Sequence, residues 1–154
     1  MDTKSLIQLV QEIVRNANNL KNKHTSEKGA LINYACIFSQ DKKQYDELSI
    51  LTRKIGKVVK ETPTGPLFSI PSIDTIAGKL RLLKIRKPDS TRPELGDADF
   101  TILDYTKFKK TYLPQKGFKL IVRENFEMIE LIDPEFNVRA YFSSPPLDVQ
   151  LKIG

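Results

Sequence analysis

The chain has 154 residues, which suits one domain or two small modules sharing a core. Its hydrophobic fraction of 40% and charged fraction of 29% are typical of a globular protein. A single cysteine and a single histidine exclude an intramolecular disulfide, a cysteine-rich metal centre and a multi-histidine metal site. Since no long apolar run and no signal-peptide core occur, we expect a cytoplasmic protein that does not span a membrane.

The formal net charge of +6 comes from 25 Lys and Arg against 19 Asp and Glu. A basic balance is compatible with nucleic acid, an anionic ligand or an anionic surface as partner. Here the cations are interleaved with acidic residues and form neither a basic arm nor a helix-turn-helix pattern. We therefore favour a solvated basic surface over nucleic-acid binding.

The first predicted element is an amphipathic helix over residues 3–20, followed by a polar connection to residue 29. Asp2 or Thr3 can provide the N-cap. The apolar stripe needs a surface to pack against, either in this chain or in a second copy, so an oligomer is compatible with the pattern. We assign residues 1–30 to this helix and connection. The stripe recurs at three- and four-residue steps: Leu6, Leu9, Val10, Ile13, Val14, Ala17 and Leu20.

After residue 30 the hydrophobic pattern predicts a strand, a helix and three further strands, and this order then occurs a second time. The first set occupies residues 31–38, 41–55, 57–62, 67–70 and 79–87, with a loop over 71–78. The second set occupies residues 97–103, 105–112, 118–123, 126–132 and 137–143. The two halves share almost no sequence identity, so the repeat is one of element order.

This order predicts an α+β fold of two βαβββ modules, residues 31–92 and 93–154. Together they would form one curved mixed or antiparallel sheet with a shared cleft, preceded by the N-terminal helix. The alternative is a single irregular α+β sheet without a repeat.

Several short segments resemble a known family. Residues 33–36, 56–61 and 64–68 are similar to the opening module of YecM-type proteins. Residues 85–88 and 94–100 look like that family's passage into its second module. YecM-type proteins and paired βαβββ modules belong with the vicinal oxygen chelate superfamily, which includes glyoxalase I, bleomycin-resistance proteins and extradiol dioxygenases. The resemblance spans residues 4–146 and implies that fold.

The resemblance also implies positions for a divalent metal, which in this superfamily is held by His and Glu on equivalent strands. The opening His falls on Tyr34, or on Asn33 with a one-residue slip, and the following Glu falls near Lys84. The second His falls on Asp97, and the last ligand falls within residues 140–142. Only Asp97 suits a hard cation and Lys84 would repel one, so we expect neither a metal nor another cofactor.

Alternation along four strands gives a candidate ligand site. One choice of strand faces brings the candidates around a single pocket, where arginine forks and a tyrosine hydroxyl suit a carboxylate or phosphate. In the alternative, half of them face water as solvated ion pairs. The candidates are Tyr34, Lys84, Arg86, Asp97, Asp99, Arg139 and Tyr141.

The loop over residues 86–94 has two interpretations. It either holds Arg92 and Glu94 over the cleft, or pairs its acids Asp89 and Glu94 with its own arginines. Cys36 lies in an apolar strand, so we expect a buried, inert thiol. A nucleophilic thiol needs a base, and the single histidine, His24, lies outside the modules.

We therefore expect a glyoxalase-like protein that lacks the metal site and binds a small anionic ligand. One alternative is a metal-independent lyase or isomerase that uses Lys84, Tyr34 and Asp97 in acid–base roles, and the sequence leaves open whether the protein is an enzyme. The other is a basic nucleic-acid or protein interaction module.

Overall fold

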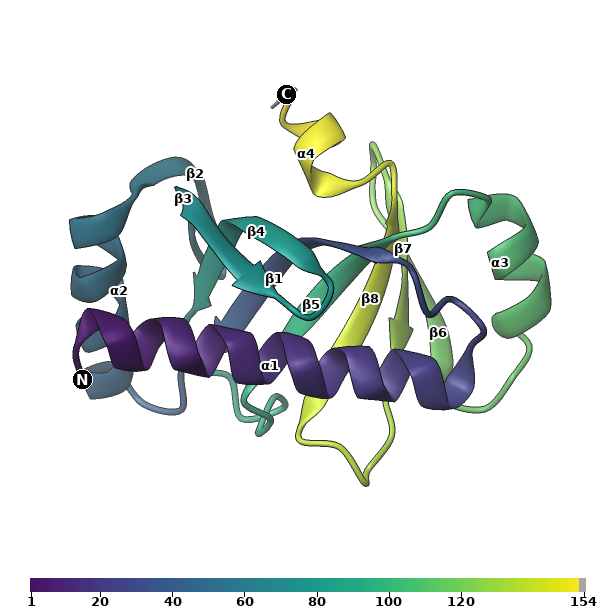
Figure 1. Ribbon diagram of the computed structural model, residues 1–154, viewed down its shortest axis with the longest axis horizontal. Helices are drawn as coiled ribbons and strands as arrows, with labels where there is room; N and C mark the ends of the chain where they lie inside the picture. Colours follow the sequence, from purple (N-terminus) through teal and green to yellow (C-terminus); the bar gives the residue numbers. More distant parts are fainter. Residues whose placement is uncertain (153–154) are drawn as a thin grey trace.

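Two sets of four strands make a single eight-stranded sheet in the computed structural model, which describes residues 1–152 (Figure 1). The helices are α1 (Thr3–His24), α2 (Lys42–Ile55), α3 (Tyr105–Tyr112) and α4 (Leu147–Gln150). The strands are β1 (Leu31–Phe38), β2 (Lys57–Thr62), β3 (Gly65–Thr75), β4 (Gly78–Arg86), β5 (Gly96–Thr101), β6 (Phe118–Val122), β7 (Glu127–Leu131) and β8 (Val138–Ser144).

The strand order is β2-β3-β4-β1-β5-β8-β7-β6, which is the same module placed twice. In each half the last strand lies parallel to the first, β4 beside β1 and β8 beside β5. The two halves meet where β1 and β5 pair antiparallel. This topology confirms the predicted α+β fold with two βαβββ modules in one mixed sheet.

Helix α1 lies across one face of this sheet, with α2 and α3 toward its two ends (Figure 1). Each buried Leu, Val or Ile contributes about 1.5–3 kcal/mol, so docking on the sheet stabilises the helix far more than its intrinsic propensity does. The predicted apolar stripe therefore packs against this chain's own sheet. Its fully buried members are Leu6, Val10, Ile13, Val14, Ala17 and Leu20.

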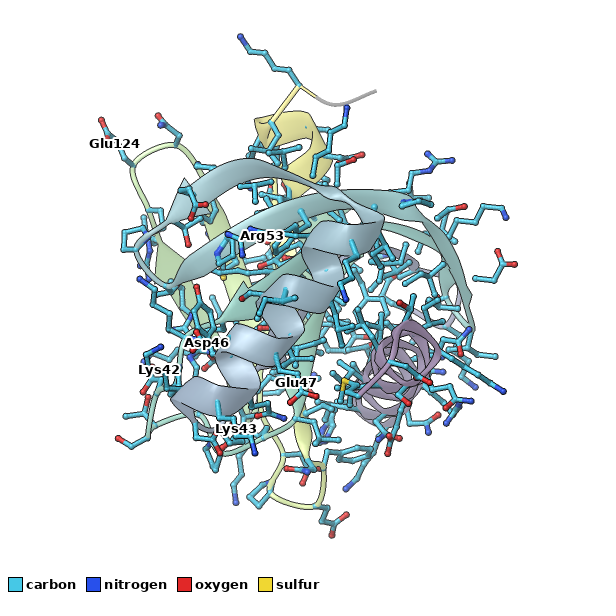
Figure 2. All side chains as sticks on the ribbon, turned by 90° about the vertical axis from the view of Figure 1, so that its left-hand side faces the viewer. Lys42, Lys43, Asp46, Glu47, Arg53 and Glu124 are labelled. Atoms are coloured by element: carbon cyan, nitrogen blue, oxygen red, sulfur yellow. The ribbon has the colours of Figure 1, made fainter. Side chains whose placement is uncertain are left out.

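The outer surface of α2 carries charged side chains that point away from the sheet (Figure 2). Lys42 pairs with Asp46 one turn later, and its Nζ lies 2.6 Å from Asp46 Oδ2. Glu47 accepts a hydrogen bond from the α-amino group of Met1 at 2.8 Å, which joins the start of α1 to α2. No helix within residues 1–152 is long and apolar enough to cross a membrane.

Helix α1 extends four residues beyond its predicted end, to His24. The sequence assigns Lys21 to a polar connection, yet this side chain is fully buried. Its ammonium lies 5.2 Å from the centre of the Phe100 ring and donates hydrogen bonds to Asn22 Oδ1 and to the Glu27 carbonyl. The aliphatic stem and these acceptors allow a lysine to continue the buried stripe.

Strand β3 is also longer than predicted, because the expected loop over 71–78 is mostly strand. The pairing of β3 with β4 is interrupted between Ser69 and Ile73, and the exposed Pro71 lies within the interruption. Proline has no N–H to donate, so an unpaired position is where a strand can contain it.

The two faces of the sheet differ in chemistry. Ala35, Ile37, Ala98 and Phe100 point toward the helices and belong to the core. Their neighbours point the other way because successive side chains alternate. We call this second side the open face. It carries Tyr34, Cys36, Asp97, Asp99, Arg139 and Tyr141 on the two central strands and β8.

Candidate functional site

A cavity of about 400 Å³ lies on the open face. Its floor is formed by side chains of β4, β1, β5 and β8, and Arg92 reaches it from the connection between the modules. Leu147 and Gln150 of α4 complete the wall. Helix α4 was not predicted, because the sequence signals there only that Pro145 and Pro146 end the last strand.

Strand register lines up the floor of this cavity. Lys84 lies opposite Cys36, Cys36 opposite Asp97, and Asp97 opposite Arg139. Neighbouring strands are about 4.8 Å apart, so the backbones of Lys84 and Asp97 are separated by roughly 10 Å, with Cys36 between them. A cation and a carboxylate thus face the same small space from two strands.

All seven predicted site residues belong to the open face, and five of them line the cavity: Tyr34, Lys84, Arg86, Asp97 and Tyr141. Asp99 and Arg139 do not. Asp99 is buried and accepts hydrogen bonds from the backbone N–H and the hydroxyl of Ser143. Its carboxylate is therefore occupied within the protein.

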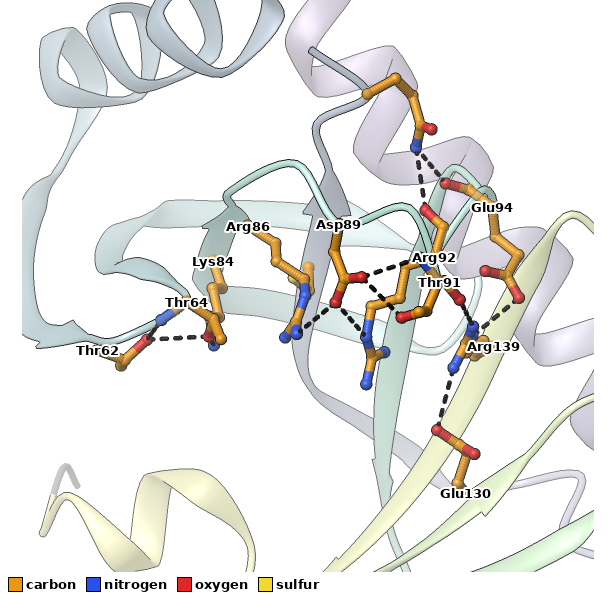
Figure 3. Close-up of polar contacts among 12 residues, drawn as sticks. Thr62, Thr64, Lys84, Arg86, Asp89, Thr91, Arg92, Glu94, Glu130 and Arg139 are labelled. Atoms are coloured by element: carbon orange, nitrogen blue, oxygen red, sulfur yellow. Dashed lines mark hydrogen bonds and ion pairs between the residues drawn. The ribbon is translucent and has the colours of Figure 1, made fainter. Parts of the chain in front are cut away.

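Arg139 is occupied as well, because it clamps the crossover loop, residues 87–95, to β8 (Figure 3). Its Nε donates to Glu94 Oε2 at 2.8 Å and its Nη2 donates to the Thr91 carbonyl at 2.8 Å. Its Nη1 donates to Glu130 Oε2 at 3.3 Å. These contacts leave the guanidinium little capacity for a ligand.

The crossover loop combines both predicted behaviours. Asp89 accepts from Arg86 Nη2 at 3.3 Å, and its Oδ2 lies 3.9 Å from Arg92 Nε (Figure 3). Hydrogen bonds from Thr91, together with Arg86, lower the pKa of Asp89 to about 2, so this carboxylate stays ionised. Glu94 pairs with Arg139 instead of Arg92.

Arg92 enters the cavity from the crossover loop, which one of the two interpretations of this loop predicts and which no strand pattern indicates. Its Nη1 donates to the Tyr141 hydroxyl at 2.9 Å, and its guanidinium lies 5.3 Å from the centre of the Phe38 ring. A loop residue has no periodicity that predicts where its side chain points. The only sequence signal is the pair of prolines, Pro88 and Pro93, which restricts the loop.

Lys84 provides a third cation from β4. Its Nζ donates to Thr64 Oγ1 at 2.5 Å, in the turn between β2 and β3 (Figure 3). Burial lowers the pKa of Lys84, because the charged ammonium has lost much of its water. We refer to Lys84, Arg86 and Arg92 as the cation cluster.

Asp97 faces the cation cluster without touching it. The side chain is 5% exposed, and its Oδ1 has no hydrogen-bond partner within residues 1–152. Burial, with added repulsion from Asp99, raises its pKa to about 7, against the opposing attraction of Arg92, Lys84 and Arg86. Buried carboxylates are normally paired, so this unsatisfied acceptor calls for an explanation.

The remaining cavity groups are less open to chemistry. The Tyr141 hydroxyl donates to Glu130 Oε2 at 2.5 Å, and burial raises its pKa. Burial also raises the pKa of the Cys36 thiol, so little reactive thiolate forms. His24 is no base for Cys36, because its Nε2 lies 2.8 Å from Asp133 Oδ2.

The residues do not fit the metal that the superfamily resemblance implies. The corresponding positions hold Tyr34, Lys84, Asp97 and the stretch 140–142, with one carboxylate among them. Across the described part of the chain, no three His, Cys, Asp or Glu side chains are grouped to hold a metal ion. The ammonium of Lys84 also lies in the same cavity.

Comparison with known proteins shows likeness in fold. No protein-family model and no curated protein matches the sequence. A solved structure described as "Structural Genomics, Protein EC4020" is similar with a TM-score of 0.72 and 9% identity, over 97% of this chain and 90% of that one. A glyoxalase/bleomycin resistance protein/dioxygenase superfamily member from Vibrio splendidus 12B01 gives a TM-score of 0.45 and 8% identity, over 74% of this chain and 97% of that one. The first structure therefore shares its fold with this protein along nearly the whole of both chains.

Proposed function

We propose that this chain binds a small anionic ligand in the cavity of the open face, as a YecM-type relative of the glyoxalase-like proteins that lacks their metal site. The observation that supports this most is the cation cluster, in which Lys84, Arg86 and Arg92 line one cavity. A carboxylate or phosphate is the chemistry that guanidinium forks and a lysine ammonium bind.

Burial makes this cluster receptive to an anion. The pKa of Lys84 is lowered because its charge is poorly solvated, and a bound anion would compensate for the missing water. Arg86 has a buried Nε with no partner within residues 1–152, so one donor of its fork is unused. Among residues 1–152, Asp89 is the one acid that pairs with the arginines of the cluster, and it does so from the loop.

Three surface lysines outside the cavity are held in exposed ion pairs. Lys42 pairs with Asp46, Lys79 pairs with Asp74, and Lys23 pairs with Asp133 and Glu135. Such exposed pairs support a solvated surface more than a patch for nucleic acid.

Titration calorimetry with succinate and with inorganic phosphate tests the proposal. We expect the Lys84→Met variant to weaken binding by about tenfold or more, because a charge-assisted hydrogen bond is lost. The matched control is Lys79→Met, which removes an exposed lysine from the other end of β4. Equal binding by both variants would overturn the proposal, and so would a wild type that binds neither these anions nor hydroxyl- or ammonium-bearing anions such as malate and aspartate.

A second candidate function is a metal-independent lyase or isomerase that uses Asp97 for proton transfer. It is favoured by the pKa of about 7 at a carboxylate that faces the cavity together with Lys84 and Tyr34. The test is exchange of the C–H protons of malate or aspartate with deuterated water, followed by NMR. Exchange that is lost in Asp97→Asn supports this candidate, and no exchange by wild type rules it out for these compounds.

A further inference from the structure

Two buried polar atoms in the cavity wall lack hydrogen-bond partners within residues 1–152, and they are of opposite kinds. Asp97 Oδ1, on β5, is an acceptor without a donor, and Arg86 Nε, on β4, is a donor without an acceptor. The two strands flank β1 on its two sides. Both residues line the cavity, so its wall contains one unmet acceptor and one unmet donor.

Asp97 is unusual among the buried carboxylates of the open face. Asp99 is bound by Ser143, and Glu130 is bound by Tyr141 and Arg139. Glu94 has one free oxygen, but its other oxygen is held by Arg139. Asp97 takes part in no side-chain hydrogen bond or ion pair with any of residues 1–152. The fold satisfies its other acids here and leaves this one for something else.

The cations of the cavity do not supply the missing contact. Lys84 is directed to Thr64, Arg86 to Asp89, and Arg92 to Tyr141. In the strand register, Cys36 lies between Lys84 and Asp97. Its side chain is small, and its thiol, a weak donor, points to the backbone carbonyl of Ile37 on the same strand. At this position β1 therefore contributes only a weak donor, and the nearest other polar side chain of β1 in the cavity is Tyr34, two residues earlier.

This inference rests on the anion site proposed above. We propose that the ligand is an anion that also carries a hydrogen-bond donor, either a hydroxyl or an ammonium group. Asp97 accepts a hydrogen bond from this donor, and the cation cluster binds the anionic group. Small hydroxy acids and amino acids have this pairing of groups. A ligand of this class would satisfy both unpartnered atoms at once, which a plain anion cannot do.

Matched probes separate this inference from the anion site itself. Malate and aspartate each have the two carboxylates of succinate, with one hydrogen replaced by a hydroxyl or an ammonium group. Glycerol 3-phosphate and n-propyl phosphate, which differ by two hydroxyl groups, form a second pair for a phosphate ligand. We expect wild type to bind the donor-bearing member of a pair about tenfold or more tightly, using both enantiomers where the probe is chiral.

Asp97→Ala should reduce this preference to within about twofold, while the probe without a donor binds at least as well as before, since a negative charge has gone. Asp97→Asn distinguishes the two donors, because an amide oxygen still accepts from a hydroxyl but no longer neutralises an ammonium group. Asp74→Ala, at the exposed pair with Lys79, is the control and should keep the wild-type preference.

The outcomes are distinct. If wild type binds succinate or n-propyl phosphate as tightly as its donor-bearing partner, the inference is wrong and the anion site stands. If no probe of either pair binds, the anion site fails and the inference fails with it. A preference that survives in Asp97→Ala would also overturn the inference, because the donor would then be recognised elsewhere.

Discussion

Asp97 and Arg139 are direct partners in the register of β5 and β8, yet their side chains do not pair. Arg139 instead binds Glu94, Glu130 and the Thr91 carbonyl. This choice leaves Asp97 available in the cavity and gives Arg139 a structural role. The cation cluster of Lys84, Arg86 and Arg92 then remains to bind a ligand, and Lys60 and Arg123 line the same cavity.

Replacing Arg139 should destabilise the fold. Its partners Glu94 and Glu130 have side chains only 13% and 9% exposed, so Arg139→Met leaves two buried acids without their cation. We expect the free energy of unfolding to fall by about 3–5 kcal/mol, measured by urea denaturation. Lys42→Met, in an exposed pair, should lower it by about 0.5 kcal/mol or less. Similar losses of unfolding free energy in both variants would show that Arg139 does not hold the crossover loop to β8.

Replacing Asp97 should stabilise the ligand-free protein at alkaline pH. Its folded pKa of about 7 lies above the ordinary aspartate pKa of 3.8, so the folded state holds the proton more tightly than the unfolded state. Stability from this group is present below pH 4 and is lost as pH rises toward 7. We therefore expect Asp97→Asn to raise the free energy of unfolding by about 1–3 kcal/mol at pH 8 and by less at pH 5. A loss of stability at pH 8 would contradict this.

The pH dependence of binding should differ between matched probes. From about pH 6 to 8 Asp97 becomes ionised, which strengthens its bond to a hydroxyl or ammonium donor and repels a plain anion. The affinity for malate or aspartate should rise over this range, whereas the affinity for succinate should fall. Calorimetry at three pH values gives both trends, and parallel slopes would exclude Asp97 as the acceptor.

Cys36 should react slowly with thiol reagents. The side chain is buried and burial raises its pKa, so at pH 8 iodoacetamide should modify it at least about tenfold more slowly than the same residue in urea-unfolded protein. Intact-mass spectrometry over time measures both rates. Equal rates would mean that the cavity floor is open to solvent and to reagents.

The order of elements could be predicted because each strand and helix carries its own hydrophobic period. Alternation also predicts which residues of one strand share a face, such as Asp97 with Asp99 and Arg139 with Tyr141, since residues two apart on a strand point the same way. The choice of face could not be made until the helices were seen to cover the opposite side.

Other features depend on contacts between distant segments. Lys21 is buried because α1 crosses Phe100, and Pro71 remains in β3 because the pairing with β4 is interrupted there. The partners of Arg139 lie 9 to 48 residues away, so strand register predicts its position but not its bonds. Arg92 enters the cavity from a loop, where no period applies.

The most direct test of the cavity as an anion site is a ¹H–¹⁵N NMR titration of the wild-type chain with malate. We expect the largest shifts on the backbone amides of Cys36, Lys84 and Asp97, and we expect them to be lost in Lys84→Met. Shifts confined to the outer surface of α2, around Lys42 and Arg53 (Figure 2), would contradict it.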